Sequence, residues 1–402
     1  MRILQLCNKA PYPPIDGGAI AIFNLAKTFS ENDNQVTILA MNTTKHRTNP
    51  ESIPEEYTKS IVFIYIPVDT RIRPLALLLN LFFSSKPYNA LRFINTEYSN
   101  VLKNLLQNKE FDIIQLEGLY MTPYIDLIRK YSDSIIVYRS HNIEHEIWNR
   151  TALMMSNPLK KKYFGIISKR LALFEKKMLN AYDLLVPITK RDSKKLQEMG
   201  NSRPFKITPA SILKENFKKS TAPHNINSLF YIGSLDWIPN QEGLVWFIKN
   251  IWNDIKSNWP DLTFHIAGRN APKWFIRECV ENEVTFHGEV ENAHKFYENY
   301  HIMIVPLFAG SGMRIKIIEA MAQSKVVVTT SIGAEGLGFV NNLHGIITDN
   351  ASGFIKGINN LLENGEFFIK LEKNSYEFAS ENFSNEIIGK DLIQFYKQHI
   401  TE

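Results

Sequence analysis

The sequence predicts two α/β domains, each built around a sheet of parallel strands. The chain has 402 residues, which is more than one compact core usually contains. Residues 2–40 read as a strand, a loop, a helix and a second strand, which together form a βαβ unit. The same succession of strand, glycine turn and helix recurs at 229–251. A hydrophobic content of 44% and a charged content of 22% agree with a soluble globular protein.

The net charge and the two cysteines indicate which kinds of ligand and which redox state to expect. A net charge of +5 and a pI near 8.9 suit phosphorylated ligands or an anionic membrane surface. They fall short of the strongly basic footprint of a nucleic-acid binder, so we expect no nucleic-acid partner. Cys7 and Cys279 lie far apart in the sequence and match no metal-ligand spacing. We therefore expect reduced thiols and no bound metal.

Two apolar segments bear on the location of the protein. The apolar run at Met1–Cys7 is too short for a signal peptide and reads as a first strand. The longest apolar run, Leu75–Phe83, is about half the ~20 residues needed to span a bilayer. We expect a cytoplasmic protein without a transmembrane helix.

The first domain is predicted from alternating apolar runs and helical periodicities. Residues 206–212 close this domain, which we place at 1–213, and a polar linker follows. The expected strands are 2–6, 35–40, 60–67, 111–117, 135–138 and 183–188, and the expected helices include 19–29 and one that begins at Thr189–Asp192.

The loop after the first strand ends in Gly17 and Gly18. It lacks the Gly-x-Gly-x-x-Gly pattern, which counts against a nicotinamide or flavin site. Open α/β sheets nevertheless bind ligands where a strand gives way to a helix. Both glycines are therefore candidate ligand-binding residues, and an ordinary turn is the alternative.

Two helical segments of this domain combine cations with apolar residues. In the segment 71–93 we expect the apolar face to pack on its own domain, and an interfacial role is the alternative. For the segment 160–177, contact with an anionic membrane and a simple solvated face both stay open. The apolar face of the first segment consists of Leu75, Leu78, Leu79 and Phe82, with Arg71, Arg73, Lys86 and Arg92 around it; the second carries Lys160, Lys161, Lys162, Lys169, Arg170, Lys176 and Lys177.

His141 directly follows the strand expected at 135–138. The carboxyl end of a parallel strand borders the ligand crevice, and an imidazole there can donate a hydrogen bond to a hydroxyl or a phosphate. His141 is therefore a candidate catalytic residue, with Glu144 close by. A purely structural histidine is the alternative.

The second domain, placed at 228–384, continues with strands and ends in helices. Its first turn contains Gly233 and Ser234, and its helix buries Leu244 and Phe247 among others. Further strands are expected at 263–267, 284–287, 302–306 and 325–330, with helices from 354 to the end.

The stretch 305–322 combines a short apolar strand, a glycine loop and an amphipathic helix expected to start near Met313. Gly310 and Gly312 permit a tight turn and a close approach of the backbone to a ligand. The free N–H groups and the dipole of a helix N-terminus attract an anion. This order predicts a phosphate site.

Three charged residues strengthen the prediction of a phosphate site. Arg314 and Lys316 add cations, and Glu319, one turn later, suits vicinal hydroxyls such as those of ribose. Phosphate and ribose together indicate a nucleotide. The alternative is a buried strand and a capped helix whose charges are only solvated.

The segment Gly310–Ala322 is similar to the retaining glycosyltransferases of family 4 (group 1), in the branch with Gly-x-Gly-x-Arg-x-Lys-x-x-Glu-Ala-Met-Ala. The resemblance covers nearly the whole chain. It implies the GT-B fold, with two Rossmann-like α/β domains facing each other across a cleft, nucleotide bound by the C-terminal domain, and a last helix at about 385–402 that returns to the N-terminal domain. The more widespread family pattern has Glu at the position of Ser311, beside the transferred sugar.

The resemblance also implies roles for individual residues. Many relatives carry Arg and Lys in the turn after 232, where this chain has Ser234 and Asn240, so we expect Arg314 and Lys316 to neutralise the diphosphate. The turn Ser331–Gly336 is expected to face the phosphates. The implied catalytic residues are His141, Ser311 and Glu319, and the implied donor-binding residues are Gly17, Gly18, Gly233, Ser234, Gly310, Gly312, Met313, Arg314, Lys316, Glu319, Gly333 and Glu335.

The predicted activity is transfer of a sugar, of the hexosyltransferase type, from a nucleoside diphosphate sugar to an acceptor hydroxyl with retention. The chain lacks an Asp-x-Asp motif, which fits members that need no metal or other cofactor. The cationic helices point to a lipid-linked glycan precursor in cell-surface polysaccharide biosynthesis and to peripheral contact with the inner face of an anionic membrane. The alternatives are a nucleotide-sugar epimerase, a glycan phosphorylase, and a non-catalytic nucleotide-sugar-binding subunit, the last suggested by Ser311.

Overall fold

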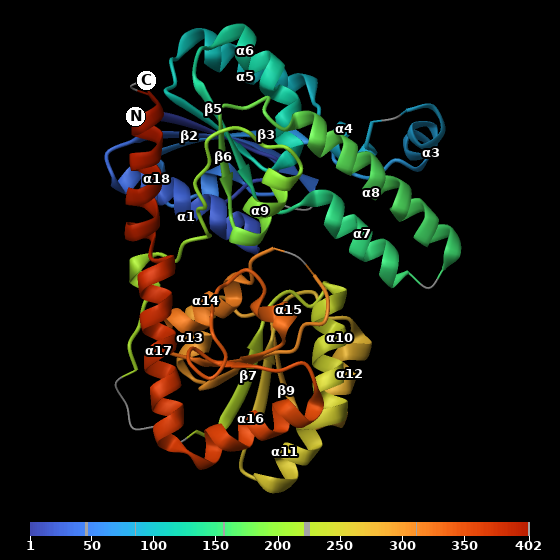
Figure 1. The fold of residues 1–402 in the computed structure, drawn as a ribbon, viewed down its shortest axis with the longest axis vertical. Helices are drawn as coiled ribbons and strands as arrows, with labels where there is room; N and C mark the ends of the chain where they lie inside the picture. Colours follow the sequence, from blue (N-terminus) through green and yellow to red (C-terminus); the bar gives the residue numbers. More distant parts are fainter. Residues whose placement is uncertain (45–46, 85, 156, 221–225, 311, 401–402) are drawn as a thin grey trace. The chain divides into compact units, whose positions relative to one another are not determined.

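A computed structural model describes the chain except for residues 45–46, 85, 156, 221–225, 311 and 401–402. The chain forms two compact units, one made of Met1–Ser211 and the residues from Ile388 on, and one made of Ile212–Ile387 (Figure 1). The linker expected after 213 belongs to the second unit, since the Lys218 N–H donates to the carbonyl of Ala322 at 2.9 Å.

The first unit contains a six-stranded parallel sheet in the order β3-β2-β1-β4-β5-β6. The order reverses between β1 and β4, which is where open α/β sheets bind ligands. The strands are β1 (Arg2–Cys7), β2 (Gln35–Thr43), β3 (Ile61–Val68), β4 (Ile113–Glu117), β5 (Ile135–Ser140) and β6 (Leu184–Pro187).

Helices cover both faces of this sheet. Leu4 and Leu6 of β1 pack in one apolar cluster with α5 and α6, whereas Ile3 and Cys7 pack in another with α1. The helices are α1 (Gly17–Glu31), α2 (Glu55–Thr58), α3 (Pro74–Phe83), α4 (Tyr88–Leu91), α5 (Thr96–Asn108), α6 (Ile125–Tyr131), α7 (Glu144–Met154), α8 (Pro158–Met178), α9 (Lys190–Glu198) and α18 (Asn385–Ile400), with 3-10 turns at η2 (Pro50–Ser52) and η3 (Leu119–Tyr124).

The last helix, α18, completes the core of the first unit, as predicted. Leu392 and Tyr396 are fully buried in the cluster that also contains Phe29 of α1. The Tyr396 hydroxyl donates to Oε1 of Gln115 on β4 at 2.5 Å. Residues close to the end of the chain thus contribute to the fold of its beginning.

The expectation that α3 packs its apolar face on its own domain is wrong. Leu75, Phe82 and Phe83 are 72%, 74% and 84% exposed, and Leu79 is exposed as well. Helical periodicity groups apolar residues on one face but does not determine whether anything covers that face. Among the described residues no helix is long and apolar enough to cross a bilayer.

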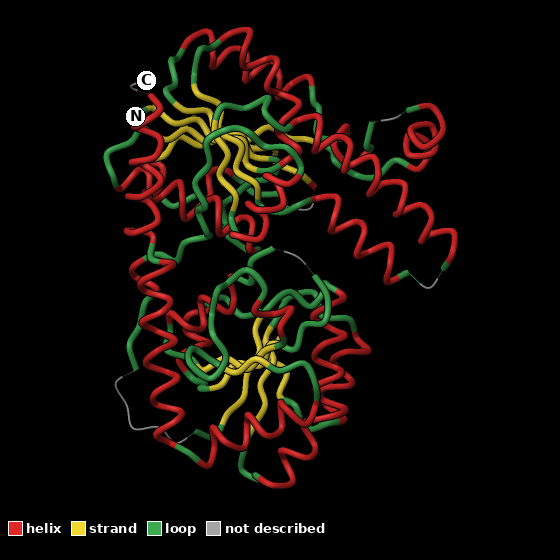
Figure 2. The backbone as a smooth tube through the Cα atoms, viewed as in Figure 1, coloured by secondary structure: helices red, strands yellow, loops and turns green. Residues whose placement is uncertain are grey.

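The second unit repeats the architecture of the first. Its six-stranded parallel sheet has the order β12-β11-β10-β7-β8-β9 (yellow in Figure 2), which is the same strand order counted from its own first strand. The reversal lies between β7 and β10. The strands are β7 (Ser228–Ile232), β8 (Thr263–Ala267), β9 (Thr285–Gly288), β10 (Ile302–Val305), β11 (Val326–Thr329) and β12 (Ile346–Ile347).

The helices of the second unit follow these strands in the alternation expected for an α/β domain. They are α10 (Ile238–Phe247), α11 (Asn253–Asn258), α12 (Lys273–Glu281), α13 (Ala293–Glu298), α14 (Ile315–Ala322), α15 (Ser331–Ala334), α16 (Ala351–Glu363) and α17 (Gly365–Phe383), with a π turn η5 (Ile248–Trp252) between α10 and α11 and a 3-10 turn η4 (Lys214–Asn216) near the start of the unit.

Candidate functional site

The loop that follows β10 makes the tight turn that its glycines predict. Gly310 and Gly312 have φ angles of 126° and 78°, a region that side chains with a Cβ rarely adopt. Helix α14 begins at Ile315 rather than near Met313, because Arg314 occupies the capping position with φ −87° and ψ 76°. Arg314 and Lys316 are therefore not both part of a regular helical turn. Ser311 lies outside the described residues.

Lys316 reaches from α14 to the turn that follows β7. Its Nζ donates to the hydroxyl of Tyr231 at 2.6 Å and to Oδ1 of Asn240 at 2.9 Å. A Cβ added at Gly233 would lie 2.7 Å from the Tyr231 hydroxyl and 3.1 Å from Nζ, so this turn needs glycine. Burial, together with the charge of Arg314, lowers the pKa of Lys316 to about 7. An anion bound beside Lys316 would raise this pKa again and keep the amine protonated.

Arg314 is buried beside the same turn. Its guanidinium donates to the carbonyl of Gly312 and lies 6.0 Å from the centre of the Trp237 ring, just before α10. A Cβ at Gly310 would lie 2.7 Å from that ring and 2.9 Å from a guanidinium nitrogen. The glycine loop, Trp237 and Arg314 thus pack into one assembly in which only glycine fits at 310.

A third cation comes from the turn after β8. Arg269 donates through Nε to Oγ of Ser234 at 3.1 Å, and that hydroxyl donates to Oδ1 of Asp236 at 2.9 Å. Gly268 allows this approach, because a Cβ there would lie 2.1 Å from the carbonyl oxygen of Gly233. The loops that leave β7, β8 and β10 therefore meet at the strand reversal of this sheet.

Glu319 projects from α14 toward Tyr297 of α13. The hydroxyl of Tyr297 donates to its carboxylate and lies 3.4 Å from the carbonyl of Lys316. Burial raises the pKa of Glu319 to about 7, and the bond from Tyr297 opposes this shift. A buried carboxylate has lost hydrogen bonds from water, so its oxygens need other donors. Neutral hydroxyl groups of a ligand can supply them.

The turn formed by α15 is occupied by its own contacts. The N–H of Gly333 donates to Oγ1 of Thr330 at 3.0 Å, and that of Ser331 donates to Oδ1 of Asp349 at 2.7 Å. A Cβ at Gly333 would lie 2.0 Å from Oγ1 of Thr329, so glycine is required for packing. The N–H of Glu335 bonds to the carbonyl of Ile332 at 3.3 Å. Donor contacts by Gly333, Glu335 and Met313 stay predictions.

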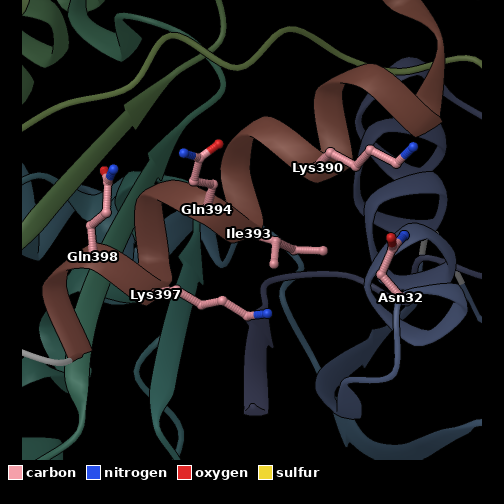
Figure 3. Close-up of a pocket in the computed structure, with 6 residues that line it drawn as sticks. All are labelled: Asn32, Lys390, Ile393, Gln394, Lys397 and Gln398. Carbon is pink, nitrogen blue, oxygen red and sulfur yellow. The ribbon is translucent and has the colours of Figure 1, made fainter.

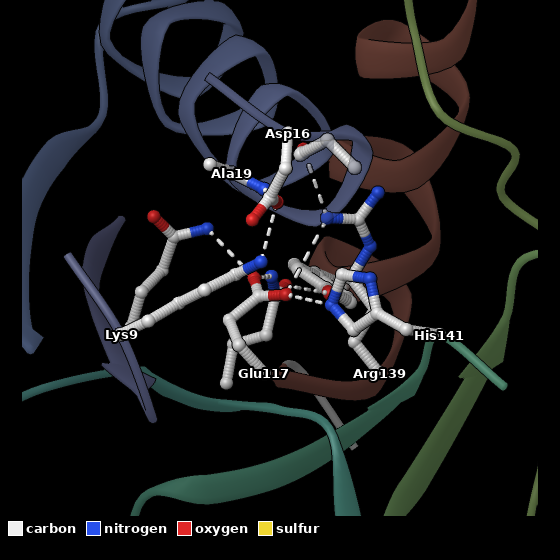
Figure 4. Close-up of polar contacts among 10 residues, drawn as sticks. Lys9, Asp16, Ala19, Glu117, Arg139 and His141 are labelled. Atoms are coloured by element: carbon white, nitrogen blue, oxygen red, sulfur yellow. Dashed lines mark hydrogen bonds and ion pairs between the residues drawn. The ribbon is translucent and has the colours of Figure 1, made fainter. Parts of the chain in front are cut away.

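In the first unit, His141 bonds to a buried acid that sequence reasoning did not select. Figure 4 shows Nε2 of His141 pointing at Glu117, the last residue of β4, with 2.6 Å between Nε2 and Oε2. Glu117 also accepts bonds from Gln5 at 3.1 Å and from Gln115. Arg139 lies 3.5 Å from Oε2 and donates to the carbonyl of Ala21 at 3.0 Å.

These contacts determine which nitrogen of His141 carries the proton. Burial lowers the pKa of His141, so the ring is neutral near pH 7. Burial alone would raise the pKa of Glu117, but the charge of Arg139 and the bond from His141 hold it below its ordinary value. An ionised carboxylate only accepts, so Nε2 carries the hydrogen and Nδ1 is an acceptor. The hydrogen bond that we expected His141 to donate to a ligand therefore requires the doubly protonated imidazolium, because Nε2–H is already bonded to Glu117.

Replacing Glu117 with glutamine should separate the orientation of His141 from donor binding. The amide of glutamine can donate as well as accept, so the ring is no longer restricted to the tautomer with hydrogen on Nε2, and we expect kcat to fall by about 10- to 100-fold. The donor KM should stay within about twofold. Steady-state kinetics over pH 6–9 is the measurement, with Asp112→Asn, just before the same strand, as the control. A change confined to KM would remove Glu117 from this positioning role.

The two glycines after the first loop occupy the first turn of α1 rather than the loop itself. Asp16 caps this helix by accepting from the Ala19 N–H at 2.9 Å, and Lys9 forms a 2.5 Å ion pair with Asp16. A Cβ at Gly18 would lie 2.8 Å from Nζ of Lys9. Because Gly18 has no side chain, Lys9 can approach the N-terminus of α1. Ligand binding by Gly17 and Gly18 stays a prediction.

Glu144 has partners of its own, separate from the pair of His141 and Glu117. Its carboxylate accepts from the Tyr120 hydroxyl at 2.7 Å, and its N–H donates to Glu175 of α8 at 2.9 Å. Burial raises the pKa of Glu144 to about 7. Glu175 also accepts from the N–H of His145 at 3.0 Å, so it caps the start of α7.

A surface hollow of about 580 Å³ lies away from these residues. It lies between α18 and the residue after α1, as Figure 3 shows. Helix α1 has 15 residues and is therefore ~22 Å long, which separates this hollow from Gly17. The described residues contain no group of three or more His, Cys, Asp or Glu side chains placed to hold a metal. The residues that line the hollow are Asn32, Lys390, Ile393, Gln394, Lys397 and Gln398.

Comparison with known proteins finds a family model that matches part of the second unit. Residues 226–364 match the family model described as Glycosyl transferases group 1. The chain is 23% identical over 415 residues to a Klebsiella pneumoniae protein described as an uncharacterized 44.6 kDa protein in the cps region, covering 98% of this chain and 99% of that one.

Solved structures share the whole fold at low sequence identity. Alr3699/HepE of Anabaena, solved in complex with UDP, has a TM-score of 0.70 at 14% identity, over 99% of this chain and 100% of that one. Sucrose-phosphate synthase from Thermosynechococcus elongatus has a TM-score of 0.73 at 14% identity, over 100% of both chains. The chain therefore has the GT-B fold, and its residues 226–364 match the model of the glycosyl transferases of group 1.

Proposed function

We propose that this protein is a retaining glycosyltransferase that moves a sugar from a nucleoside diphosphate sugar to an acceptor hydroxyl. The observation that carries the proposal is the reach of Lys316 from α14 to the turn after β7, at the reversal of the second sheet. Arg314 and Arg269 lie beside the same turn. The similar structure of Alr3699/HepE, solved with UDP, supports a nucleotide ligand.

The chemistry that this site supports is mainly electrostatic. The diphosphate gains charge as it leaves the sugar, and preorganised cations stabilise that charge in the transition state. Lys316 and Arg314 supply cations, and the N-terminus of α14 adds the positive end of its helix dipole. In this proposal no metal is needed, Glu319 binds the ribose hydroxyls, and the leaving phosphate takes the proton of the acceptor hydroxyl.

The proposed acceptor is a lipid-linked glycan precursor of a cell-surface polysaccharide. The relative from Klebsiella pneumoniae described as lying in a cps region supports this direction. In the first unit, α8 presents exposed lysines that include Lys161 and Lys169. We place the enzyme in the cytoplasm at the inner face of the membrane, where such an acceptor would be available.

A thermal-shift screen tests the donor class. The panel is UDP, GDP, ADP, CMP and dTDP, with the nucleosides as controls. A ligand at 100 times its Kd stabilises by about 2.7 kcal/mol, which shifts the Tm of a domain of this size by several degrees. We expect one nucleoside diphosphate of the panel to produce this shift, and UDP is the first choice. The matching nucleoside should produce no shift.

Three results would contradict the proposal. If no nucleotide shifted the Tm, the chain would be a scaffold rather than a transferase. If the matching nucleotide sugar were converted to its epimer without any acceptor, the epimerase alternative would replace it. Nucleotide binding without turnover in membrane extracts would favour the non-catalytic subunit.

A further inference from the structure

The first unit exposes an apolar helical face that its own core leaves uncovered. We call Ile72, Leu75, Leu79, Phe82 and Phe83 the α3 surface; each is an exposed large apolar side chain. Spacings of four and three residues place Leu75, Leu79 and Phe82 on one side of α3, and Ile72 lies just before the helix. Single exposed apolar residues are common on a monomer, but a contiguous group of this kind marks an interaction site.

Polar contacts at the ends of α3 hold the helix in place. Arg170 of α8 donates to the carbonyls of Asn80 at 3.1 Å and Leu81 at 2.7 Å, near the end of α3. At its start, the N–H of Arg73 donates to the Tyr88 hydroxyl at 3.1 Å. Figure 1 shows α3 at the rim of the unit, beyond α4 and α8 from the sheet. The helix is thus fixed without burying its apolar side.

Cations surround the α3 surface. The side chains of Arg71 and Arg73 are about three-quarters exposed, and Lys86 is exposed just beyond the helix. The nearby acid is Asp69, which bonds to Arg71 at 2.9 Å and to Arg73 at 3.5 Å. Three cations against one carboxylate leave this rim positive. A second copy of the chain would bring the same charge against it, which disfavours self-association.

We propose that the α3 surface inserts into the headgroup region of an anionic lipid bilayer. Helix α3 has ten residues and is ~15 Å long, too short to span ~30 Å of hydrocarbon. A helix with an apolar side and a cationic rim lies in the plane of the interface instead. Anionic headgroups then attract the rim, by about 1 kcal/mol for each nearby cation. The inference extends the lipid-linked acceptor proposed above by naming the element that enters the membrane.

Vesicle flotation tests the insertion. The full chain, without donor or acceptor, is mixed at low salt with vesicles of phosphatidylcholine alone or with about one third phosphatidylglycerol. We expect binding to the anionic vesicles and at least a 10-fold weaker partition for the double variant Leu75→Glu, Phe82→Glu. Both side chains are exposed, so the variant should keep the Tm of the parent. The matched control is Val280→Glu, Ile369→Glu, which changes two exposed apolar residues of the second unit.

A fluorescent label reports depth independently of affinity. The native thiols, Cys7 and Cys279, are both buried, so an introduced surface cysteine can be labelled selectively. A polarity-sensitive dye on Phe82→Cys should shift to the blue with anionic vesicles, and the same dye on Ile369→Cys should not. Equal shifts at both positions would overturn the assignment of α3 as the inserted element.

The remaining outcomes are also decisive. Equal flotation of the Leu75→Glu, Phe82→Glu variant and the parent would overturn the proposal, as would equal binding to neutral and anionic vesicles. A dimer in light scattering that this variant dissociates would show a second copy on the α3 surface instead. A UDP thermal shift on the same variants separates the two proposals, because lost flotation with an intact shift contradicts only membrane insertion.

Discussion

Replacing Glu319 with alanine is expected to abolish the thermal shift caused by nucleoside diphosphates and to lower kcat/KM at least 100-fold. The carboxylate is partly buried beside Tyr297, and two hydroxyl groups of a ribose would each form a charge-assisted bond with it. Bonds to charged groups contribute ~1.5–3 kcal/mol each, so the loss of two corresponds to a factor of 100 or more.

The variant Glu319→Gln refines this expectation. The amide keeps the volume and one acceptor, so about a 10-fold loss should remain. An unchanged nucleotide shift in Glu319→Ala, with the Tm of the unliganded protein preserved, would remove Glu319 from the site.

Replacing Lys316 with methionine is expected to lower kcat/KM about 100-fold, mainly through donor binding. Methionine keeps the length of the side chain against Tyr231 and Asn240 but removes the charge that, in the proposed function, faces the diphosphate. A charge-assisted bond to phosphate contributes ~1.5–3 kcal/mol, and more as the leaving group gains charge. The control is Lys325→Met, beyond the other end of α14. Equal kinetics in both variants would contradict the role of Lys316.

The variants Glu319→Gln and Lys316→Met should show opposite pH dependences of nucleotide affinity. The pKa of Lys316 is lowered to about 7 by burial, and a bound diphosphate raises it, so affinity at this group falls as pH rises through 7. The pKa of Glu319 is raised to about 7 by burial, and hydroxyl donors favour its ionised form, so affinity at this group rises over the same window. We expect nucleotide affinity to fall from pH 6 to 8 in Glu319→Gln and to rise in Lys316→Met, measured by calorimetry.

Much of the fold is predictable because buried parallel strands are near-continuous apolar runs. Segments such as 2–6 and 263–267 read as strands on this ground, and both are strands in the structure. Gly310 and Gly312 were predicted to turn the loop, and their positive φ angles agree. The start of α14 was misplaced by two residues because no capping side chain marks it.

The parts of the site that sequence reasoning missed are those that depend on neighbours across the sheet. Glu117 ends a buried strand, and an acid at the end of an apolar run was the only available signal. Tyr231 and Trp237 resemble core residues in the sequence, and Arg269 comes close only because β8 lies beside β7. Local periodicity carries no information about which loops the strand order brings together.

The helix α18 has a practical consequence for engineering. The chain enters the second unit at Ile212 and leaves it at Ile387, so the first unit is encoded by two separate segments. A chimera that exchanges the first unit for that of a relative needs two junctions rather than one. A truncation before Ile388 would remove Leu392 and Tyr396 from the core around Phe29. Removing the residues from Ile388 on is therefore expected to unfold the unit that Met1–Ser211 forms with them.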